Sequence, residues 1–364
     1  MVFNPFLAGA SSFITQTKVF HDMQQNFMKS AEQLLAFNFP SSDMTVLHPD
    51  PVDIGDWERG VFKAPNQEAT GTSKKFIDGL EYYTFIPSTT TENQHTKHRS
   101  ILVMLHGCEQ NASVFAQGSQ MNIYAQKYGF IVLYPQQSKK NNFAQCWQWY
   151  DLDPESGMAE ANTIMELIAQ AVKKYKVNPK NIFVAGMSAG AGMANAIAFK
   201  FPEKIAAVAL HSGPVFGQAN NVRSGLKVMG GISYENDEEL ISYLKTFAKP
   251  KAHDIPTLII HGVKDRMVNI SNAEALSKQA LYLNDLPLDT PAVVTRHDTD
   301  TPNAYTQKVY SYEETPIVEV LEVDNMTHNW AGGDTSLPFN SNYGPNSSET
   351  ILRFFYRYVT PNKG

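Results

Sequence analysis

Short, continuous runs of apolar residues that alternate with segments of helical periodicity constrain the fold of this chain more than any other feature. The runs predict strands at 80–86, 101–105, 130–134, 182–185, 206–210, 257–261, 309–312 and 318–323. The intervening and closing segments predict helices at 113–128, 158–175, 189–199, 272–281 and 348–358. Apolar strands separated by helices are typical of a parallel sheet buried on both faces. The chain is therefore predicted to be an α/β protein with a mostly parallel sheet and helices on both faces.

The chain divides into three regions of different composition. Residues 1–45 carry aromatic and aliphatic side chains at helical spacing and predict an N-terminal helical arm. This arm either packs on the main domain or attaches to a hydrophobic body such as a granule surface. Residues 46–77 are rich in Pro, Gly, Asp and Thr and predict a connecting segment, and 78–360 are expected to form the main domain. Within that domain, 213–251 show a weaker pattern and are expected to form a lid or cap insertion.

Composition excludes several classes of function. The net charge is −6 and Lys and Arg occur at most in adjacent pairs, so no nucleic-acid partner is expected. No run reaches the roughly 18 apolar residues of a transmembrane helix, so no transmembrane segment is expected. The patterns HExxH, CxxC, GxGxxG and the P-loop are absent, so no metal site and no cofactor are expected. The first residues lack the charged segment of a signal peptide and are expected to be retained.

Residues 186–190 read Gly-Met-Ser-Ala-Gly and match the pattern G-x-S-x-G. A predicted strand precedes the motif and a predicted helix follows it, which is the context of a nucleophile elbow. Such a turn lifts the serine hydroxyl above the sheet edge, and glycines on both sides let strand and helix approach. Ser188 is therefore the candidate nucleophile.

A serine nucleophile needs a base and an acid, and in proteins with this elbow the acid precedes the histidine in the chain. Asp265 follows the predicted strand at 257–261 and is the candidate acid; Asp254, before that strand, is a weaker alternative. His328 follows the predicted strand at 318–323 and is the candidate base. The other histidines considered are His106, His211, His253, His261 and His297. His211 and His261 end strands and have a second interpretation as buried structural residues.

Attack on an ester creates negative charge on the carbonyl oxygen, and two fixed N–H donors are expected to stabilise it. One donor is predicted to be the amide of Ala189, directly after the nucleophile. The other is predicted to be the amide of Cys108, because a His-Gly pair follows the strand at 101–105 as in many oxyanion turns. The side chain of Cys108 is also compatible with a small buried hydrophobe.

Several motifs in this order resemble the polyhydroxybutyrate depolymerase family of esterases, which have the α/β-hydrolase fold and include related feruloyl and acetylxylan esterases. The motifs are LHGCEQ, CWQW, GMSAG, HG-x-x-D and HNWAGG, and the resemblance covers about 78–360. The resemblance implies that Ser188, Asp265 and His328 form the catalytic triad and that Cys108 and Ala189 supply the oxyanion donors.

The resemblance also implies substrate-binding residues and a disulfide. Trp330, two residues after His328, would line the acyl or alcohol subsite with Asn329 beside it; the alternative for Trp330 is packing under the histidine loop. The tryptophans of the C-W-x-W element would bind substrate or pack in the core. Cys146, in the same element, would lie close enough to Cys108 for a disulfide, and the pair either forms that bond or stays as two thiols. The substrate-binding tryptophans of this prediction are thus Trp147, Trp149 and Trp330.

The expected activity is hydrolysis of poly- or oligo-(3-hydroxybutyrate) ester bonds through a seryl-acyl intermediate, without a cofactor. The polyester or oligoester substrate is the expected partner. A feruloyl or acetylxylan-type carbohydrate esterase is the alternative activity, and a non-catalytic granule-binding protein is a remote one. Because no polymer-binding module follows the main domain, a cytoplasmic location is expected, with a secreted or periplasmic location as the alternative.

Overall fold

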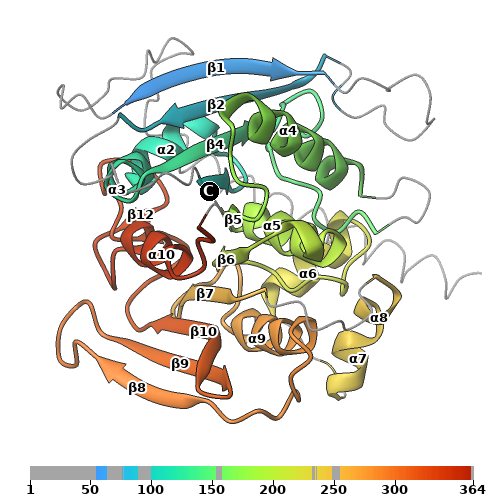
Figure 1. Cartoon of the computed structure of the whole chain (residues 1–364). Coiled ribbons are helices and arrows are strands. Elements are labelled where there is room, and N and C mark those ends of the chain that lie inside the picture. Colours follow the sequence, from blue (N-terminus) through green and yellow to red (C-terminus); the bar gives the residue numbers. More distant parts are fainter. Residues whose placement is uncertain are drawn as a thin grey trace, which may run out of the picture. The chain divides into compact units, whose positions relative to one another are not determined.

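The computed structural model describes residues 55–63, 76, 78–88, 100–152, 158–231, 234, 236–247 and 255–361 (Figure 1). The described residues belong to one compact unit, Pro51–Gly364. The helical arm expected at 1–45 lies outside the described residues.

The described strands form one ten-stranded sheet and one short two-stranded sheet. The strands of the large sheet are β1 (Asp56–Phe62), β2 (Leu80–Ile86), β3 (Ser100–Leu105), β4 (Phe130–Gln136), β5 (Ile182–Met187), β6 (Ala207–His211), β7 (Thr257–Gly262), β8 (Val293–His297), β9 (Tyr305–Tyr312) and β10 (Thr315–Val323). Their order is β1-β2-β4-β3-β5-β6-β7-β10-β9-β8, from top to bottom in Figure 1. The six central strands from β4 to β10 are parallel, and those at both ends are antiparallel.

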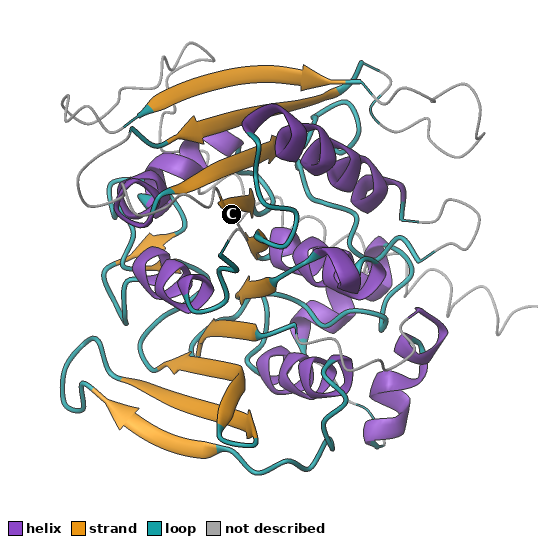
Figure 2. Cartoon of the chain, in the orientation of Figure 1, coloured by secondary structure: helices purple, strands orange, loops and turns teal. Residues whose placement is uncertain are grey.

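Two hydrophobic cores lie on the two faces of this sheet. Alternate residues of a strand point to opposite faces. In β3, Ile101, Val103 and Leu105 belong to one core, and Leu102 and Met104 to the other. The first core is covered by α4 (Ala159–Tyr175), α5 (Ala189–Lys200) and α9 (Ser271–Leu283), and the second by α2 (Ala112–Ser119), α3 (Met121–Tyr128) and α10 (Ser347–Tyr356). Figure 2 shows helices on both sides of the strands, as the sequence predicts.

The prediction of a connecting segment at 46–77 is wrong over Asp56–Phe62, because these residues form the edge strand β1. β1 pairs with β2 in antiparallel register, with Trp57 opposite Phe85. Its sequence is half polar and contains a glycine, because an edge strand buries little of its surface. A polar edge strand lacks the apolar run by which the central strands are recognised.

The single helix predicted at 113–128 is also wrong, since α2 and α3 are separate helices. The chain breaks at Gln120, whose φ of 55° lies in the left-handed region. The carbonyl oxygens just before the break accept hydrogen bonds from distant residues: that of Gly118 from the Asp334 amide at 2.8 Å, and that of Ser119 from the Ser348 hydroxyl at 2.6 Å. These tertiary partners replace the hydrogen bonds that would continue the helix.

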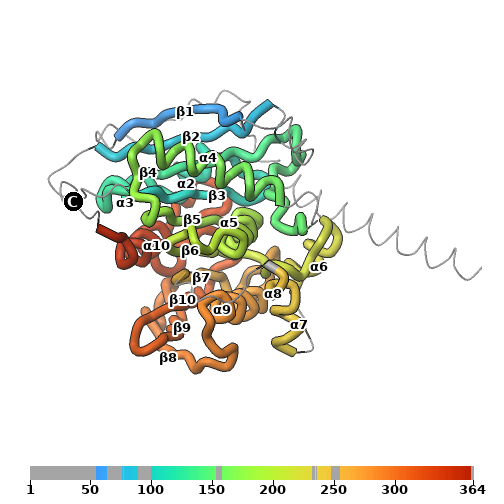
Figure 3. The backbone as a smooth tube through the Cα atoms, turned by 45° about the vertical axis from the view of Figure 1, so that its right-hand side comes forward, coloured from blue at the N-terminus to red at the C-terminus, as the bar shows by residue number. Residues whose placement is uncertain are grey.

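Three short helices occupy the region expected to be a lid or cap: α6 (Val222–Gly230), α7 (Asp237–Ser242) and α8 (Leu244–Phe247). They belong to the connection from β6 to β7, in which α7 contacts α9 and α8 contacts α5. Figure 3 shows these three helices close together in one part of the molecule. Their function as a lid stays a prediction. In the part of the chain that is described, no helix is long and apolar enough to span a membrane.

Candidate active site

Four central strands bring the predicted catalytic residues to one edge of the sheet. Because β3, β5, β7 and β10 are parallel, their carboxyl ends lie on the same side. Cys108 follows β3, Ser188 follows β5, Asp265 follows β7 and His328 follows β10. Residues separated by up to 220 positions in the chain are thereby directed to one site.

Ser188 lies on the sharp turn between β5 and α5. Its backbone has φ 56° and ψ −123°, a strained conformation for a residue with a side chain. A Cβ atom on Gly190 would lie 2.0 Å from the carbonyl oxygen of Leu105, and one on Gly186 would lie 2.3 Å from the backbone of Gly190. Only glycine fits both positions, so the two glycines of the motif are required for the elbow. The Ser188 amide donates to the carbonyl oxygen of His211 at 2.9 Å and ties the turn to β6.

Asp265 and His328 are joined by a hydrogen bond of 2.7 Å between Nδ1 of the histidine and Oδ2 of the aspartate. The other carboxylate oxygen, Oδ1, accepts hydrogen bonds from the amides of Met267 at 2.9 Å and Val268 at 2.8 Å. With Nδ1–H directed at the carboxylate, Nε2 of His328 is left as the basic nitrogen that a serine hydroxyl requires.

Charge and burial compete at the Asp265 carboxyl. Burial raises the pKa of this carboxyl. The hydrogen bond and charge of His328, together with the neighbouring His261, lower the pKa by more than burial raises it, so the net shift is downward. Asp265 is therefore ionised in the folded protein and able to stabilise the imidazolium of His328 when that forms.

The other histidines have structural surroundings. His106, His211 and His261 are completely buried, and burial lowers the pKa of each. This agrees with the structural interpretation of His211 and His261. His297 lies in β8 and bonds Gln307, while Asp254 and His253 fall outside the described residues.

His211 connects the nucleophile turn with the histidine loop. Its carbonyl oxygen accepts the Ser188 amide, and its ring stacks on Trp330 with centroids 4.6 Å apart. Nε2 also accepts a hydrogen bond of 3.4 Å from the amide of Ala331. The sequence allows a buried structural role for His211 but does not predict this connection, because the Ala331 contact joins residues 120 positions apart.

The predicted oxyanion turn, 107–109, lies against the nucleophile. A Cβ atom on Gly107 would be 3.3 Å from Cβ of Ser188. The amide of Gly107 donates to Oε1 of Gln110 at 2.8 Å, and that of Glu109 to the Ala144 carbonyl at 2.6 Å. For the Cys108 amide, the described residues provide no acceptor, and the Ala189 amide is in the first turn of α5, where helical partners are lacking. These two amides remain the predicted oxyanion donors.

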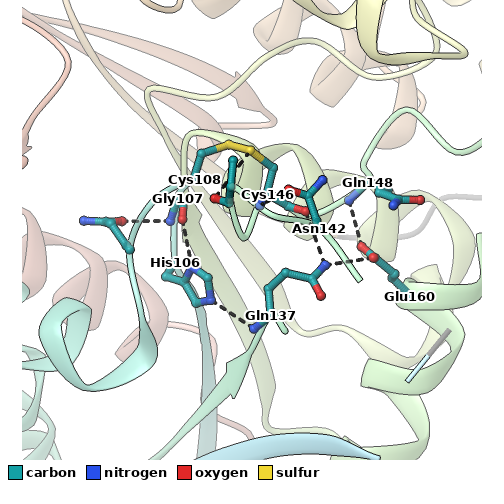
Figure 4. The surroundings of a disulfide bond; sticks show 10 residues. His106, Gly107, Cys108, Gln137, Asn142, Cys146, Gln148 and Glu160 are labelled. Carbon is teal, nitrogen blue, oxygen red and sulfur yellow. Dashed lines mark hydrogen bonds between the residues drawn. A yellow bond between two sulfur atoms is a disulfide. The ribbon is translucent and has the colours of Figure 1, made fainter. Parts of the chain in front are cut away.

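Cys108 and Cys146 lie close together, as expected, and they form a disulfide (Figure 4). Their Cα atoms are 4.2 Å apart, just below the usual range of about 4.4–6.8 Å. The bridge joins the oxyanion turn to the loop that follows β4 and closes a loop with a sequence separation of 38.

Comparison with known proteins identifies the family. The family model for esterase PHB depolymerase matches residues 80–302, which is more than half of the chain. The chain belongs to this family. The match contains Ser188 and Asp265 but ends before His328, so the assignment of the base rests on its hydrogen bond with Asp265.

Individual known proteins match parts of the chain. Poly(3-hydroxyalkanoate) depolymerase C of Paucimonas lemoignei is 28% identical over 268 residues, which cover 68% of this chain and 58% of that protein. Acetylxylan esterase A of Talaromyces purpureogenus is 30% identical over 152 residues, which cover 40% of this chain and 37% of that protein. The matches thus span roughly a third to somewhat over half of the length of these relatives.

A solved structure confirms the fold. The acetyl xylan esterase from Aspergillus awamori has a TM-score of 0.62 with 18% identity, over 82% of this chain and 100% of that one. At this identity the likeness shows the α/β-hydrolase fold alone. The predicted fold class is therefore confirmed, with a mostly parallel sheet and helices on both faces.

The three tryptophans predicted to bind substrate are core residues in this family member. Trp147, Trp149 and Trp330 are at most 3% exposed. For Trp330 the structure supports the alternative of packing under the histidine loop, because its indole N–H donates to the buried Ser348 hydroxyl at 3.1 Å. The Trp330 ring also meets Phe115 edge to face. Asn329 is half-buried and its side-chain amide donates to Thr327 at 2.6 Å; its role toward substrate stays a prediction.

Trp330→Ala is expected to damage the histidine loop rather than substrate choice. Truncating a buried tryptophan costs about 3–5 kcal/mol of stability. The loss of the stack on His211 should displace His328 and reduce hydrolysis of p-nitrophenyl acetate and of hydroxybutyrate oligomers by the same factor. Trp330→Phe, which keeps an aromatic face, should lose less. Rates on both esters and urea unfolding of each variant measure these effects. A loss of activity confined to the oligomers would instead show that Trp330 lines the acyl or alcohol subsite.

The buried His106 makes stability depend on pH. Nδ1 donates to the Gly107 carbonyl, Nε2 accepts the Gln137 amide, and burial lowers the pKa of the ring from 6.5 to about 4. Between pH 6.5 and about pH 4, the unfolded chain binds more protons than the folded protein. The free energy of unfolding is therefore highest above the pKa of the unfolded chain and falls as the pH decreases toward the pKa of the folded protein. The lowered pKa of His106 alone should reduce the free energy of unfolding by about 2 kcal/mol between pH 7 and pH 5.

Urea unfolding at a series of pH values tests this dependence. The lowered pKa values of His211 and His261 act in the same direction and should add to the loss. His106→Gln should give a flatter dependence of the unfolding free energy on pH than the unmodified protein. An unfolding free energy that is constant from pH 7 to pH 5 would contradict the assignment of neutral buried histidines.

Proposed function

We propose that the protein is a serine esterase that acts through a seryl-acyl intermediate. The observation that carries the proposal is the 2.7 Å bond of His328 to the ionised Asp265, at the sheet edge where Ser188 occupies a strained elbow. Nε2 of His328 takes the proton from the Ser188 hydroxyl as its oxygen attacks the ester carbonyl. The amides of Cys108 and Ala189 stabilise the resulting oxyanion.

The second half of the reaction uses the same groups. The protonated His328 gives its proton to the leaving alcohol, and an acyl ester remains on Ser188. His328 then removes a proton from water, which attacks the acyl carbonyl, and the proton returns to Ser188 as the acid departs. Asp265 stays ionised throughout and stabilises the imidazolium in both halves.

The proposed substrates are poly- or oligo-(3-hydroxybutyrate) esters. Membership of the esterase PHB depolymerase family and the similarity to the Paucimonas lemoignei depolymerase support this class. The similarity to acetylxylan esterases supports a second candidate, the hydrolysis of acetyl or feruloyl esters of polysaccharides. Both substrates fit the same triad, since substrate choice depends on the walls of the site.

Activity assays on matched substrates separate the two candidates. Purified protein is compared on amorphous polyhydroxybutyrate granules, soluble hydroxybutyrate oligomers, acetylated xylan and methyl ferulate, with p-nitrophenyl acetate as a common reference. The proposal predicts the highest kcat/KM on the hydroxybutyrate esters. Preference for acetylated xylan or methyl ferulate would assign the carbohydrate-esterase function, and no hydrolysis of any ester would leave a granule-binding role.

Attachment and location are further parts of the proposal. We propose that residues 1–45, which lie outside the described residues, attach the protein to a hydrophobic granule surface; deletion of this segment should reduce co-sedimentation with granules. The Cys108–Cys146 disulfide supports the secreted or periplasmic alternative over the cytoplasm, because disulfides persist in oxidising compartments. Fractionation of cells with thiol trapping distinguishes the two locations.

A further inference from the structure

A buried carboxylate holds both ends of the loop that supports the oxyanion turn. Glu160 lies in the first turn of α4 and is 1% exposed. Its Oε1 accepts a hydrogen bond from Nε2 of Gln137 at 2.8 Å, and its Oε2 accepts one from the amide of Gln148 at 2.7 Å (Figure 4). Gln137 begins the loop 137–148 and Gln148 ends it, so one side chain fixes the separation of the two ends.

The loop 137–148 contacts the residues that follow β3, including the oxyanion turn, at three places. Cys146 is covalently joined to Cys108. The carbonyl oxygen of Ala144 accepts the amide of Glu109 at 2.6 Å, and the Gln137 amide donates to Nε2 of His106 at 3.1 Å. Two of these contacts are made by Cys108 and the residue after it, so the position of the loop determines the position of the Cys108 amide.

Hydrogen bonds within the loop transmit the position of its ends to Cys146. Nε2 of Gln137 donates to the Cys146 carbonyl at 3.3 Å as well as to Glu160. The Cys146 amide donates to Oδ1 of Asn142 at 3.2 Å. Gln137 is completely buried, and hydrogen bonds of a buried carboxylate are stronger than those between neutral groups. The loop is therefore held as one unit from the Glu160 carboxylate to the disulfide.

We infer that Glu160 is a positioning residue for the oxyanion hole, acting through Gln137 and the loop 137–148 on the amide of Cys108. The inference rests on the proposed function, because an oxyanion hole has a role only if Ser188 attacks an ester. Loss of one oxyanion donor costs about 10²–10³-fold in kcat in other enzymes. Displacement of the Cys108 amide should therefore lower kcat by roughly 10- to 100-fold.

Glu160→Gln tests the inference with the smallest change of shape. The new amide has one oxygen for two donors, so either the Gln137 side chain or the Gln148 amide loses its acceptor. Glu166→Gln is the matched control, because Glu166 is an exposed glutamate on the same helix. Each variant is titrated with a phosphonate probe to count active sites, and kcat and KM are measured on p-nitrophenyl acetate. The affinity of a trifluoromethyl ketone, which forms a tetrahedral adduct, is measured beside them.

An exchange of the two side chains tests whether Glu160 acts through Gln137. In the double variant Glu160→Gln/Gln137→Glu, an amide N–H at one position again faces a carboxylate at the other, and the amide oxygen remains for Gln148. Because a glutamate at position 137 lacks the Nε2 donor to the Cys146 carbonyl, we expect the double variant to recover only part of the kcat that Glu160→Gln loses. If Glu160→Gln gives no folded protein, kcat per titrated site of Glu160→Asp, whose shorter carboxylate must draw the two ends of the loop toward α4, carries the test: a loss of at least tenfold supports the inference, and an unchanged value overturns it.

The expected result for Glu160→Gln is at least a tenfold lower kcat per titrated site, with KM within about twofold and with the ketone weakened by a similar factor. Glu166→Gln should match the unmodified protein. A kcat per site that stays unchanged, with only fewer active sites or a lower Tm, would show a purely structural role and overturn the inference. Failure of the proposed function is distinguishable, since the unmodified protein itself would then fail to titrate at Ser188.

Discussion

Ser188→Ala should reduce ester hydrolysis by about five to six orders of magnitude while the protein remains folded. The change removes the oxygen that attacks the carbonyl, and removal of a serine nucleophile in another hydrolase costs about 2 × 10⁶ in kcat. Stability should change little, because alanine keeps the Cβ atom and the Ser188 side chain makes no capping hydrogen bond. Rates on p-nitrophenyl acetate and urea unfolding of the variant measure the two effects.

A fluorophosphonate probe identifies the nucleophile directly. Mass spectrometry should find the label on Ser188 in the unmodified protein and on no residue in Ser188→Ala. Ser212 provides a matched comparison, since it directly follows the neighbouring strand β6, has a φ of 49° and is also buried. Ser212→Ala should still be labelled at Ser188, and labelling that disappears only with Ser212 would assign the nucleophile there.

Asp265→Asn should lower turnover by about four orders of magnitude without unfolding the protein. The amides of Met267 and Val268 donate to Oδ1 of Asp265, so the oxygen of an asparagine would remain with them. Its NH₂ group would then face Nδ1 of His328, which must become the acceptor. The proton would move to Nε2, the nitrogen that should receive the serine proton, and the same change in another triad costs about 10⁴ in kcat.

The dependence on tautomer can be measured separately from the dependence on fold. The NMR shifts of the His328 ring nitrogens should show protonation of Nε2 in Asp265→Asn and of Nδ1 in the unmodified protein. Asp254→Asn is the control for the acid that the sequence left as an alternative and should keep most of the activity. A large loss with Asp254→Asn and a small one with Asp265→Asn would exchange the two assignments.

The sequence correctly predicts those strands and site residues whose defining features lie within a few neighbouring positions of the chain. The apolar central strands β3 to β7 are buried on both faces, so each reads as a continuous apolar run. Ser188 is marked by the two glycines that its own turn requires, and Asp265 and His328 by their places after strands. β1 was missed because an edge strand keeps a polar sequence, and the break at Gln120 because its cause lies in Asp334 and Ser348.

By itself the sequence determined the fold class, the nucleophile turn and the identity of the residues that meet at the sheet edge, because periodicity and turn chemistry act over a few neighbouring residues. Only the tertiary structure decided that Trp330 faces the core, that His211 joins the nucleophile turn to the histidine loop, and that Glu160 holds the loop behind Cys108. These contacts join residues from 12 to 120 positions apart. Such pairs are selected by how the packed elements fit together, and no local pattern of the chain records that fit.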